Sequence, residues 1–300
     1  MHALIDIVSI LDKFAPHDGV FQTPISGLTV LKSSVPTSPE LVLYEPSVCF
    51  VVQGTKETSI GGQVYRYDAS RYLLGSARLP VIGAVVEASP SKPFICARID
   101  LDSSVIADVL ATSSVDSATK HVGGLEIGLV NDALGDTVAR LVKTAQSVDE
   151  STHIAPLYQK ELIWRLAQSR DVASVFRQMV ASGSRLMRIR KAMAWIESNY
   201  EQAVSIDKLA KLANMGTSNF FKHFKTITGE TPIRFRSRLR VMHARRKMIV
   251  DGCGAAEAGY AVGYNEPAQF SREYTRLFGC SPKLDARRFI QLAKDLSPDS

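Results

Sequence analysis

From about residue 20 to 100, the apolar residues form short, β-branched runs that glycine or proline separates. Examples are SGLTVLKS, SVCFVVQG, LPVIGAVVEA and FICARIDL. Short runs of this kind between turn-forming residues are typical of strands. They predict an all-β barrel or sandwich over about 20–100. Residues 1–14 instead place Leu4, Val8, Leu11 and Phe14 on one side of a helix, so a short helix should precede the strands.

After Asp102 the spacing of the apolar residues lengthens to that of helices, over about 103–112, 126–147 and 153–168. The last two are long enough for an antiparallel helix pair. Such a pair packs either on the barrel or on a second copy of itself, and the sequence leaves both open. A homodimer surface is therefore placed on these helices as one of the two alternatives. The periodicity breaks in SRDVASVFRQMVASGS, which puts a domain boundary near 170–184.

The segment 205–232 predicts two short helices with a tight joint between them. Ser205 is a suitable N-cap for the first helix, and Gly216 permits the turn before the second. Each helix has one apolar stripe, made by Ile206, Leu209, Ala210 and Ala213 in the first and by Phe220, Phe224 and Ile227 in the second. A helix with a buried aromatic stripe and an exposed polar, cationic face suits the major groove of DNA.

The same arrangement recurs 50 residues later, in 255–282. Phe270, Tyr274 and Leu277 repeat the spacing of the first aromatic stripe, and both units end with a glycine followed by a proline, in TGETP and FGCSP. An internal repeat is stronger evidence than either unit alone. Between the units, about 19 residues from Pro232 predict one arginine-rich helix of roughly 28 Å. A spacer of that length could hold two recognition helices about one DNA turn apart.

Charge divides the chain at the same place. Residues 184–291 hold 20 Lys and Arg against 9 Asp and Glu, whereas residues 1–183 hold 15 against 19. A charge of +11 on the helical part favours a polyanionic partner, and a charge of −4 on the rest does not.

The stretch GYNEPAQFSREYTRLFGCSP, residues 263–282, resembles the signature of the AraC/XylS family of transcription regulators. The segment LAKLANMGTSNFFKHFKTITGETP and the LRVMHARRKM that follows are similar to the first half of the same module. The resemblance covers roughly 184–290. A weaker similarity over about 20–170, in LVLYEPSVCFVVQGTKET and YRYDASRYLLGS, points to the branch with a barrel-type N-terminal domain.

This resemblance implies a DNA-binding transcription regulator, more an activator than a repressor, with double-stranded DNA as partner and RNA polymerase as a second one. The outward positions of the two recognition helices are then the expected DNA contacts: Thr217, Ser218, Phe221, Lys222, Lys225, Pro267, Ala268, Ser271, Arg272 and Thr275. The arginines from Arg234 to Arg246 should divide between phosphate contacts and solvation. The barrel is expected to bind a small effector through Gln53, Lys56, Tyr67 and Arg98.

Some positions depart from the family pattern. Gly259 stands where a small alanine is usual, which should weaken that helix by up to about 1 kcal/mol. Gly216 and Glu266 stand where serine commonly caps the recognition helices, and glutamate is the poorer replacement. Phe221 stands where a polar residue often contacts a base, so an apolar contact with a thymine methyl group is its expected use.

Other classes of function find little support in the sequence. The four cysteines form no Cys-x-x-Cys pair, and among the histidines only His17 falls near the barrel, so no metal site is predicted. His2, His121, His153, His223 and His243 lie elsewhere. No G-x-S-x-G, G-x-G-x-x-G or phosphate-binding lysine loop is present, so we expect neither an enzyme nor a cofactor. No signal peptide or long apolar stretch appears, which predicts a cytoplasmic protein without membrane contact.

The sequence thus predicts an α+β protein, with a cupin-like β-barrel and helix pair followed by an all-α double helix-turn-helix domain. The regulatory domain should span 1–175, with the barrel over about 20–100 and helices over about 103–170. The DNA-binding domain should span 184–291, with units at 205–228 and 254–278. The alternative is a small-molecule-binding or enzymatic barrel that uses its basic helical domain for nonspecific nucleic-acid binding.

Overall fold

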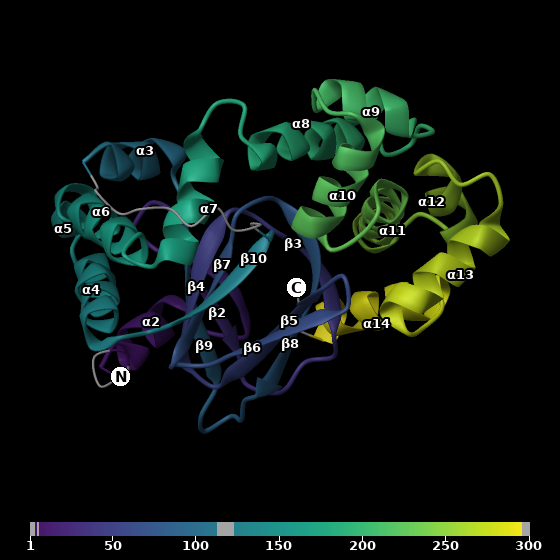
Figure 1. Ribbon diagram of the computed structural model, residues 1–300. Helices are drawn as coiled ribbons and strands as arrows, with labels where there is room; N and C mark the ends of the chain where they lie inside the picture. The colour runs from purple at the N-terminus through teal and green to yellow at the C-terminus, as the bar shows by residue number, and fades with distance from the viewer. Residues whose placement is uncertain (1–3, 5, 113–122, 296–300) are drawn as a thin grey trace.

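Strands dominate the first hundred residues and helices the last hundred and thirty. The computed structural model describes residues 4, 6–112 and 123–295, without the side chains of 290–295. In Figure 1, α3 to α7 lie on one side of the strands, and α8 to α14 arch over the other side. The sequence-based assignment to the α+β class is confirmed.

The strands form two sheets that do not close into a barrel. The larger sheet has the order β1-β2-β9-β4-β7-β10, and the smaller has the order β3-β8-β5-β6. Every pairing within them is antiparallel. The strands are β1 Gly19–Gln22, β2 Leu28–Ser33, β3 Glu40–Tyr44, β4 Ser47–Gln53, β5 Thr55–Ile60, β6 Gln63–Tyr67, β7 Arg71–Gly75, β8 Leu79–Glu87, β9 Phe94–Asp100 and β10 Leu125–Leu129.

The centre of the larger sheet is its most apolar part. β4 pairs with β9 so that Cys49 lies opposite Arg98 and Phe50 opposite Ala97. Phe50 and Ala97 are fully buried. A strand that is covered on both faces is uniformly apolar rather than alternating, which explains the unbroken run SVCFVV in β4.

The helices of the N-terminal part follow the sequence prediction except in two places. The helix expected over 126–147 begins only at Asp132, because Leu125–Leu129 forms β10 and pairs with β7. The boundary expected at 170–184 is instead mostly helical. The helices are α2 Val8–Phe14, α3 Ser103–Ala111, α4 Asp132–Lys143, the 3₁₀ turn η1 Thr144–Gln146, α5 Val148–His153, α6 Ala155–Leu166 and α7 Arg170–Val180.

The C-terminal part contains two helix-turn-helix units on a long shared helix. The first unit is α9 and α10, the second is α12 and α13, and α11 joins them, as the sequence predicts. The helices are α8 Arg185–Ser198, α9 Ile206–Leu212, α10 Thr217–Thr228, α11 Pro232–Val250, α12 Ala255–Ala261, α13 Pro267–Phe278 and α14 Pro282–Asp295.

The buried apolar residues form two clusters, and their division falls within α11. The first cluster runs from the sheets through α8, α9 and α10 and ends at Phe235 and Leu239. The second begins at Val241 and includes Phe270 and Tyr274. The first helix-turn-helix unit therefore shares a continuous core with the N-terminal part, whereas the second unit has a core of its own.

Candidate functional site

The first recognition helix, α10, buries one stripe and exposes the opposite face. Phe220 and Phe224 are fully buried and Ile227 nearly so, while Phe221 is 41% exposed. The helix begins after Gly216, which offers no capping side chain, and ends at Gly229 in the left-handed conformation. The stripe predicted from the sequence is thus the packed one, and Phe221 lies outside it.

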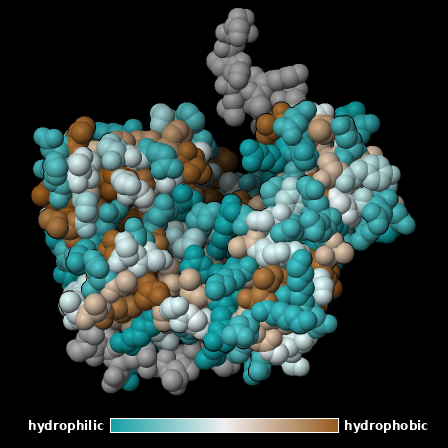
Figure 2. All heavy atoms as spheres, turned by 90° about the horizontal axis from the view of Figure 1, so that it is seen from above, coloured by the Kyte–Doolittle hydropathy of each residue, from teal (hydrophilic) through white to brown (hydrophobic). Residues whose placement is uncertain are grey.

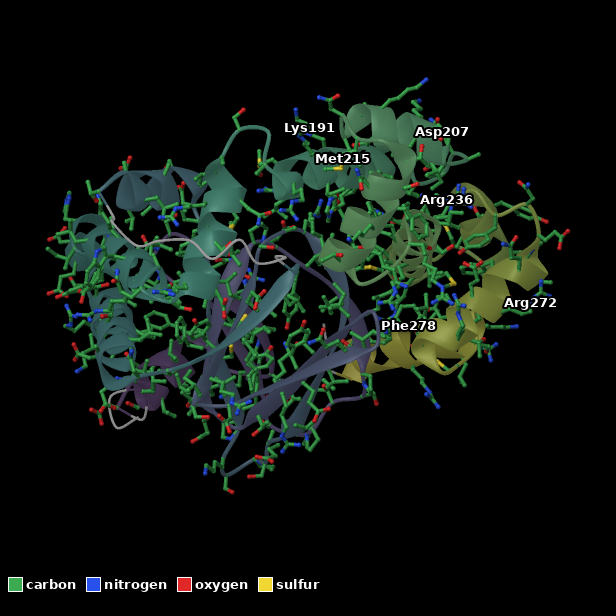
Figure 3. All side chains as sticks on the ribbon, viewed as in Figure 1. Lys191, Asp207, Met215, Arg236, Arg272 and Phe278 are labelled. Carbon is green, nitrogen blue, oxygen red and sulfur yellow. The ribbon has the colours of Figure 1, made fainter. Side chains whose placement is uncertain are left out.

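The second recognition helix, α13, repeats this arrangement. Phe270 and Tyr274 are fully buried. Glu266 occupies the N-cap without a capping hydrogen bond, as expected from its side chain, and Gly279 closes the helix in the left-handed conformation. Figure 3 shows Arg272 on the outer side of α13, directed away from the rest of the molecule.

The expected DNA contacts lie on the surface of the two recognition helices. Eight of the ten are exposed, and Pro267 and Ser271 are partly buried. The Thr217 hydroxyl donates a hydrogen bond of 3.1 Å to Asp207, so the start of α10 is tied to α9. Seen from above, the surface around these helices is mostly hydrophilic, and a recess separates this surface from the N-terminal part (Figure 2).

The arginines of α11 depart from the sequence prediction. Four of them bind other parts of the protein instead of facing solvent or phosphate, because three main-chain carbonyls of one turn and two carboxylates lie within their reach. Arg236 donates to Gln202 O, Arg238 pairs with Glu230, Arg240 donates to Tyr200 O and Glu201 O, and Arg245 pairs with Asp285. Arg234 and Arg246 are exposed and stay available for phosphate.

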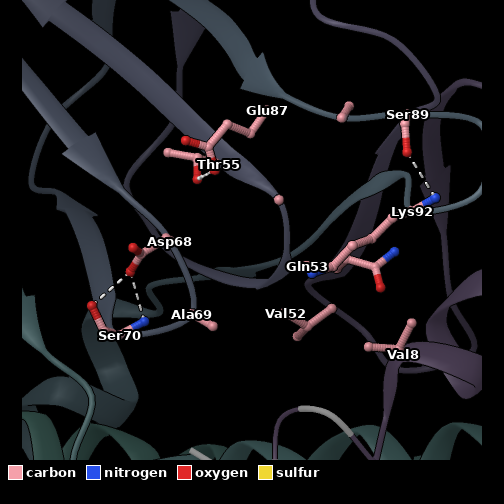
Figure 4. A pocket seen from close by; sticks show the side chains of 12 residues that line it. Val8, Val52, Gln53, Thr55, Asp68, Ala69, Ser70, Glu87, Ser89 and Lys92 are labelled. Carbon is pink, nitrogen blue, oxygen red and sulfur yellow. Dashed lines mark hydrogen bonds between the residues drawn. The ribbon is translucent and has the colours of Figure 1, made fainter.

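A second feature is a cavity of about 730 Å³ at one end of the two sheets. Figure 4 shows its polar lining from β4, β5 and the turns near β6 and β8. The Thr55 hydroxyl donates to Glu87 at 2.7 Å, and the Ser70 hydroxyl donates to Asp68 at 2.6 Å. The lining residues are Val8, Val52, Gln53, Gly54, Thr55, Asp68, Ala69, Ser70, Glu87, Ala88, Ser89 and Lys92.

Of the four residues expected to bind an effector, the structure places Gln53 in this lining and the other three elsewhere. Lys56 and Tyr67 are buried between the sheets. There the Tyr67 hydroxyl lies 3.2 Å from both the Tyr44 and the Thr58 hydroxyl. Arg98 lies on β9, with Nη2 donating to the Thr29 hydroxyl at 3.3 Å. Gln53 therefore lines this cavity, whereas Lys56, Tyr67 and Arg98 do not.

Among the residues that the structure describes, no three His, Cys, Asp or Glu side chains come together as a metal-binding group. His2 and His121 lie outside those residues. No described helix is both long and apolar enough to span a membrane.

Two protein-family models match the chain. The AraC-type transcriptional regulator N-terminus matches residues 24–174, and a helix-turn-helix domain matches residues 209–288. The chain belongs to the AraC family. It is therefore a DNA-binding transcription regulator, as the repeated units predicted.

Two curated relatives of this AraC-family regulator are transcription activators. The lactose operon transcription activator of Staphylococcus xylosus is 24% identical over 243 residues, which cover 80% of this chain and 83% of the relative. The activator RhaS of Pectobacterium carotovorum is 27% identical over 106 residues, which cover 35% of this chain and 38% of that protein.

The fold has a counterpart among solved structures. The crystal structure of ToxT from Vibrio cholerae with a bound unsaturated fatty acid is 12% identical, with a TM-score of 0.55, and the match covers 87% of this chain and 93% of that one. At this identity the likeness concerns the fold alone.

One departure of this AraC-family chain from the usual pattern has a packing reason. A Cβ on Gly259 of α12 would lie 3.1 Å from the ring of Phe270. The glycine therefore allows the aromatic stripe of α13 to approach α12 closely, which offsets the helix propensity that it loses. A resemblance in sequence identifies the position but not this contact.

Proposed function

We propose that the chain activates transcription by binding a specific DNA site with both helix-turn-helix units. The observation that supports this most is the repeat itself: two recognition helices with the same buried stripe and exposed opposite face, joined by the single helix α11 of 19 residues. Each helix would enter one of two successive major-groove segments. Activation follows from what the two curated relatives are named for.

Matching positions of the two units suggest which side chains contact bases and which contact phosphates. Lys222 and Arg272 occupy equivalent places, one turn after the N-terminus of their helices, and both are exposed. An arginine there can donate two hydrogen bonds to one guanine, whereas Lys225, nearer the C-terminus of α10, suits a phosphate. Phe221 would cover a thymine methyl group. The remaining expected contacts are Thr217, Ser218, Pro267, Ala268, Ser271 and Thr275.

The DNA-binding proposal is tested by selecting binding sites from random duplexes with the full chain. We expect one enriched site with two conserved segments. At physiological salt, random DNA should compete for the protein at least about 10³-fold more weakly than the selected site does. Equal competition by selected and random duplexes would instead favour the alternative, in which the basic helical domain attaches to nucleic acid nonspecifically.

We also propose that the cavity at the end of the sheets binds the effector. Its hydroxyl, amide and carboxylate groups beside Val52 and Ala88 suit a small polar molecule with some apolar surface. A panel of sugars, amino acids and carboxylic acids can be screened by thermal melting of the full chain. A ligand of this cavity should stabilise the wild type and fail to stabilise Ala88→Trp, which fills the space. Equal stabilisation of both proteins would place the ligand elsewhere.

Two partners complete the proposal. An activator bound beside a promoter would contact RNA polymerase. A homodimer would form through α6, where Leu157 is 62% and Trp164 46% exposed, two turns apart on one face of the helix. The contacts with RNA polymerase and with a second copy of the chain would both form in the cytoplasm, where the DNA is.

A further inference from the structure

The two helix-turn-helix units meet at one buried arginine. Arg240 lies in the middle of α11, between Leu239, the last residue of the first apolar cluster, and Val241, the first residue of the second. Its side chain is only 7% exposed. A charged side chain at the boundary between two cores requires hydrogen-bonding partners there, because burying an unpaired charge is costly.

These partners come from the first unit's side of the boundary. Arg240 Nε donates to Tyr200 O at 2.6 Å, and Nη2 donates to Glu201 O at 2.7 Å. Both carbonyls lie in the turn that follows α8. The planar guanidinium therefore binds this turn with two diverging hydrogen bonds, which a lysine could not reproduce.

The second unit packs against the same guanidinium. Arg240 Cζ lies 5.3 Å from the ring centre of Tyr264, whose hydroxyl donates to Glu273 of α13 at 2.6 Å. Gly263 has a φ of +89°, and a Cβ there would lie 2.6 Å from Arg240 Nη2 and closer still to Glu201 O. The turn that leads into the second recognition helix therefore lies directly against the arginine and its partner.

Tyr200 extends this junction to both cores. Among the residues that the structure describes, it alone packs against both apolar clusters, and its ring stacks on His243 of α11 at 4.2 Å. Apart from α11 itself, the junction between the two units thus includes Tyr200, Glu201, Arg240, Gly263 and Tyr264.

We propose that Arg240 is a positioning residue that sets the angle and separation of the two recognition helices, and hence the spacing between the two DNA segments that they recognise. It does this without touching DNA. A helix of 19 residues fixes the distance along its axis. Among the contacts described above, only this one joins the turn after α8 directly to the turn that leads into α13, so it restrains the rotation of one unit relative to the other. The inference rests on the proposed binding of one site by both units.

The test compares duplexes in which the two selected segments are moved one or two base pairs closer or farther apart. One base pair turns the second segment by about a tenth of a DNA turn. We expect the wild type to lose about tenfold or more in affinity for each altered spacing. Arg240→Gln and Arg240→Lys should lose affinity for the original spacing but show a much smaller spacing penalty, with base preferences inside each segment unchanged.

Arg236→Gln is the matched control, because Arg236 donates to Gln202 O in the same turn at 2.7 Å but does not bridge to Tyr264. It should keep the wild-type spacing penalty. If Arg240→Gln fails to fold by circular dichroism, Tyr264→Phe tests the same junction, because it removes the hydroxyl's hydrogen bonds to Glu273 and Ser237 and keeps the ring.

The outcomes separate this inference from the proposed function. A wild type that prefers no sequence would contradict the proposed function itself. A wild type that binds a specific site while the Arg240 and Tyr264 variants keep its full spacing penalty would overturn the positioning role. The same would follow if Arg236→Gln flattened the penalty as much as Arg240→Gln, since the effect would then be general loosening.

Discussion

Arg245 on α11 and Asp285 on α14 form a buried ion pair, with Nε 2.8 Å from Oδ2 and side chains that are 15% and 9% exposed. The same carboxylate oxygen accepts a 2.6 Å hydrogen bond from Tyr274 of the second recognition helix. The guanidinium lies over the rings of Phe278 and Phe289. This pair therefore holds α13 between two other helices.

Asp285→Asn should destabilise the second unit, because Arg245 would stay buried without its counter-charge. Breaking such a pair costs about 3–5 kcal/mol. Urea denaturation of the full chain measures the loss, and Asp251→Asn, an exposed change at the end of α11, should stay within about 0.5 kcal/mol of the wild type. Equal stability of Asp285→Asn and Asp251→Asn would show that the pair contributes nothing net.

The acidity of Asp285 gives the same pair a pH dependence. Burial alone would raise the pKa of the Asp285 carboxyl, but hydrogen bonds from Arg245 and Tyr274 hold the pKa below its ordinary value. Because the folded-state pKa is lowered, the stabilisation is present above about pH 4 and is lost as the pH falls through the lowered pKa.

Glu230 should affect the pH dependence of stability in the opposite direction to Asp285. Burial raises the pKa of Glu230 to about 7, although Arg238 opposes the shift at 2.9 Å. Because the pKa of this carboxyl is raised in the folded state, the folded protein is less stable when Glu230 is ionised than when it is protonated. We expect the wild type to lose up to roughly 3 kcal/mol relative to Glu230→Gln as the pH rises from about 4.5 to above 7.

Denaturant titrations at several pH values test this prediction for Glu230. Glu266→Gln serves as the control, since Glu266 is exposed and makes no capping hydrogen bond. A stability difference between the wild type and Glu230→Gln that does not change with pH would mean that the carboxyl titrates normally.

Phe221→Ala should leave stability almost unchanged and alter recognition. Because the ring is 41% exposed and lies off the buried stripe, its truncation should cost less than about 1 kcal/mol, whereas Phe220→Ala should cost about 3–5 kcal/mol. Site selection with the folded variant should lose a preference for thymine in the segment that α10 recognises. A large drop in melting temperature with unchanged base preference would assign Phe221 to the core.

Arg272→Ala and Lys225→Ala should affect DNA binding in different ways. The first should cost about 1–3 kcal/mol on the selected site and little on random DNA, because it removes a base contact. The second should weaken binding to both and reduce the salt dependence, because it removes a phosphate contact. If both variants weaken all duplexes equally, Arg272 contacts phosphate.

The helix-turn-helix units could be predicted from sequence because their signal is local. Phe220 and Phe224, like Phe270 and Tyr274, lie one turn apart and repeat in both units. The start of α4 was missed because Leu125–Leu129 pairs with β7, about fifty residues away. The apolar residues of this segment fit the spacing of a helix as well as that of a strand. Periodicity over a few residues cannot reveal such a pairing.

The roles of the α11 arginines were missed for a related reason. Arg236 and Arg240 bind main-chain carbonyls of residues 200–202, which leave no mark in the sequence. Gln53, Lys56 and Tyr67 show the same limit. Alternation predicts polar side chains on two faces of a strand, but which of them lines the cavity depends on how strands distant in sequence pack together.

Hydroxyl-radical footprinting of the full chain on its selected site shows whether one chain recognises two adjacent major-groove segments. We expect two protected segments on one face of the duplex, about one helical turn apart, with Arg272→Ala weakening the protection of one segment and Phe221→Ala that of the other. Protection of a single segment, or loss of both segments together in either variant, would contradict this prediction.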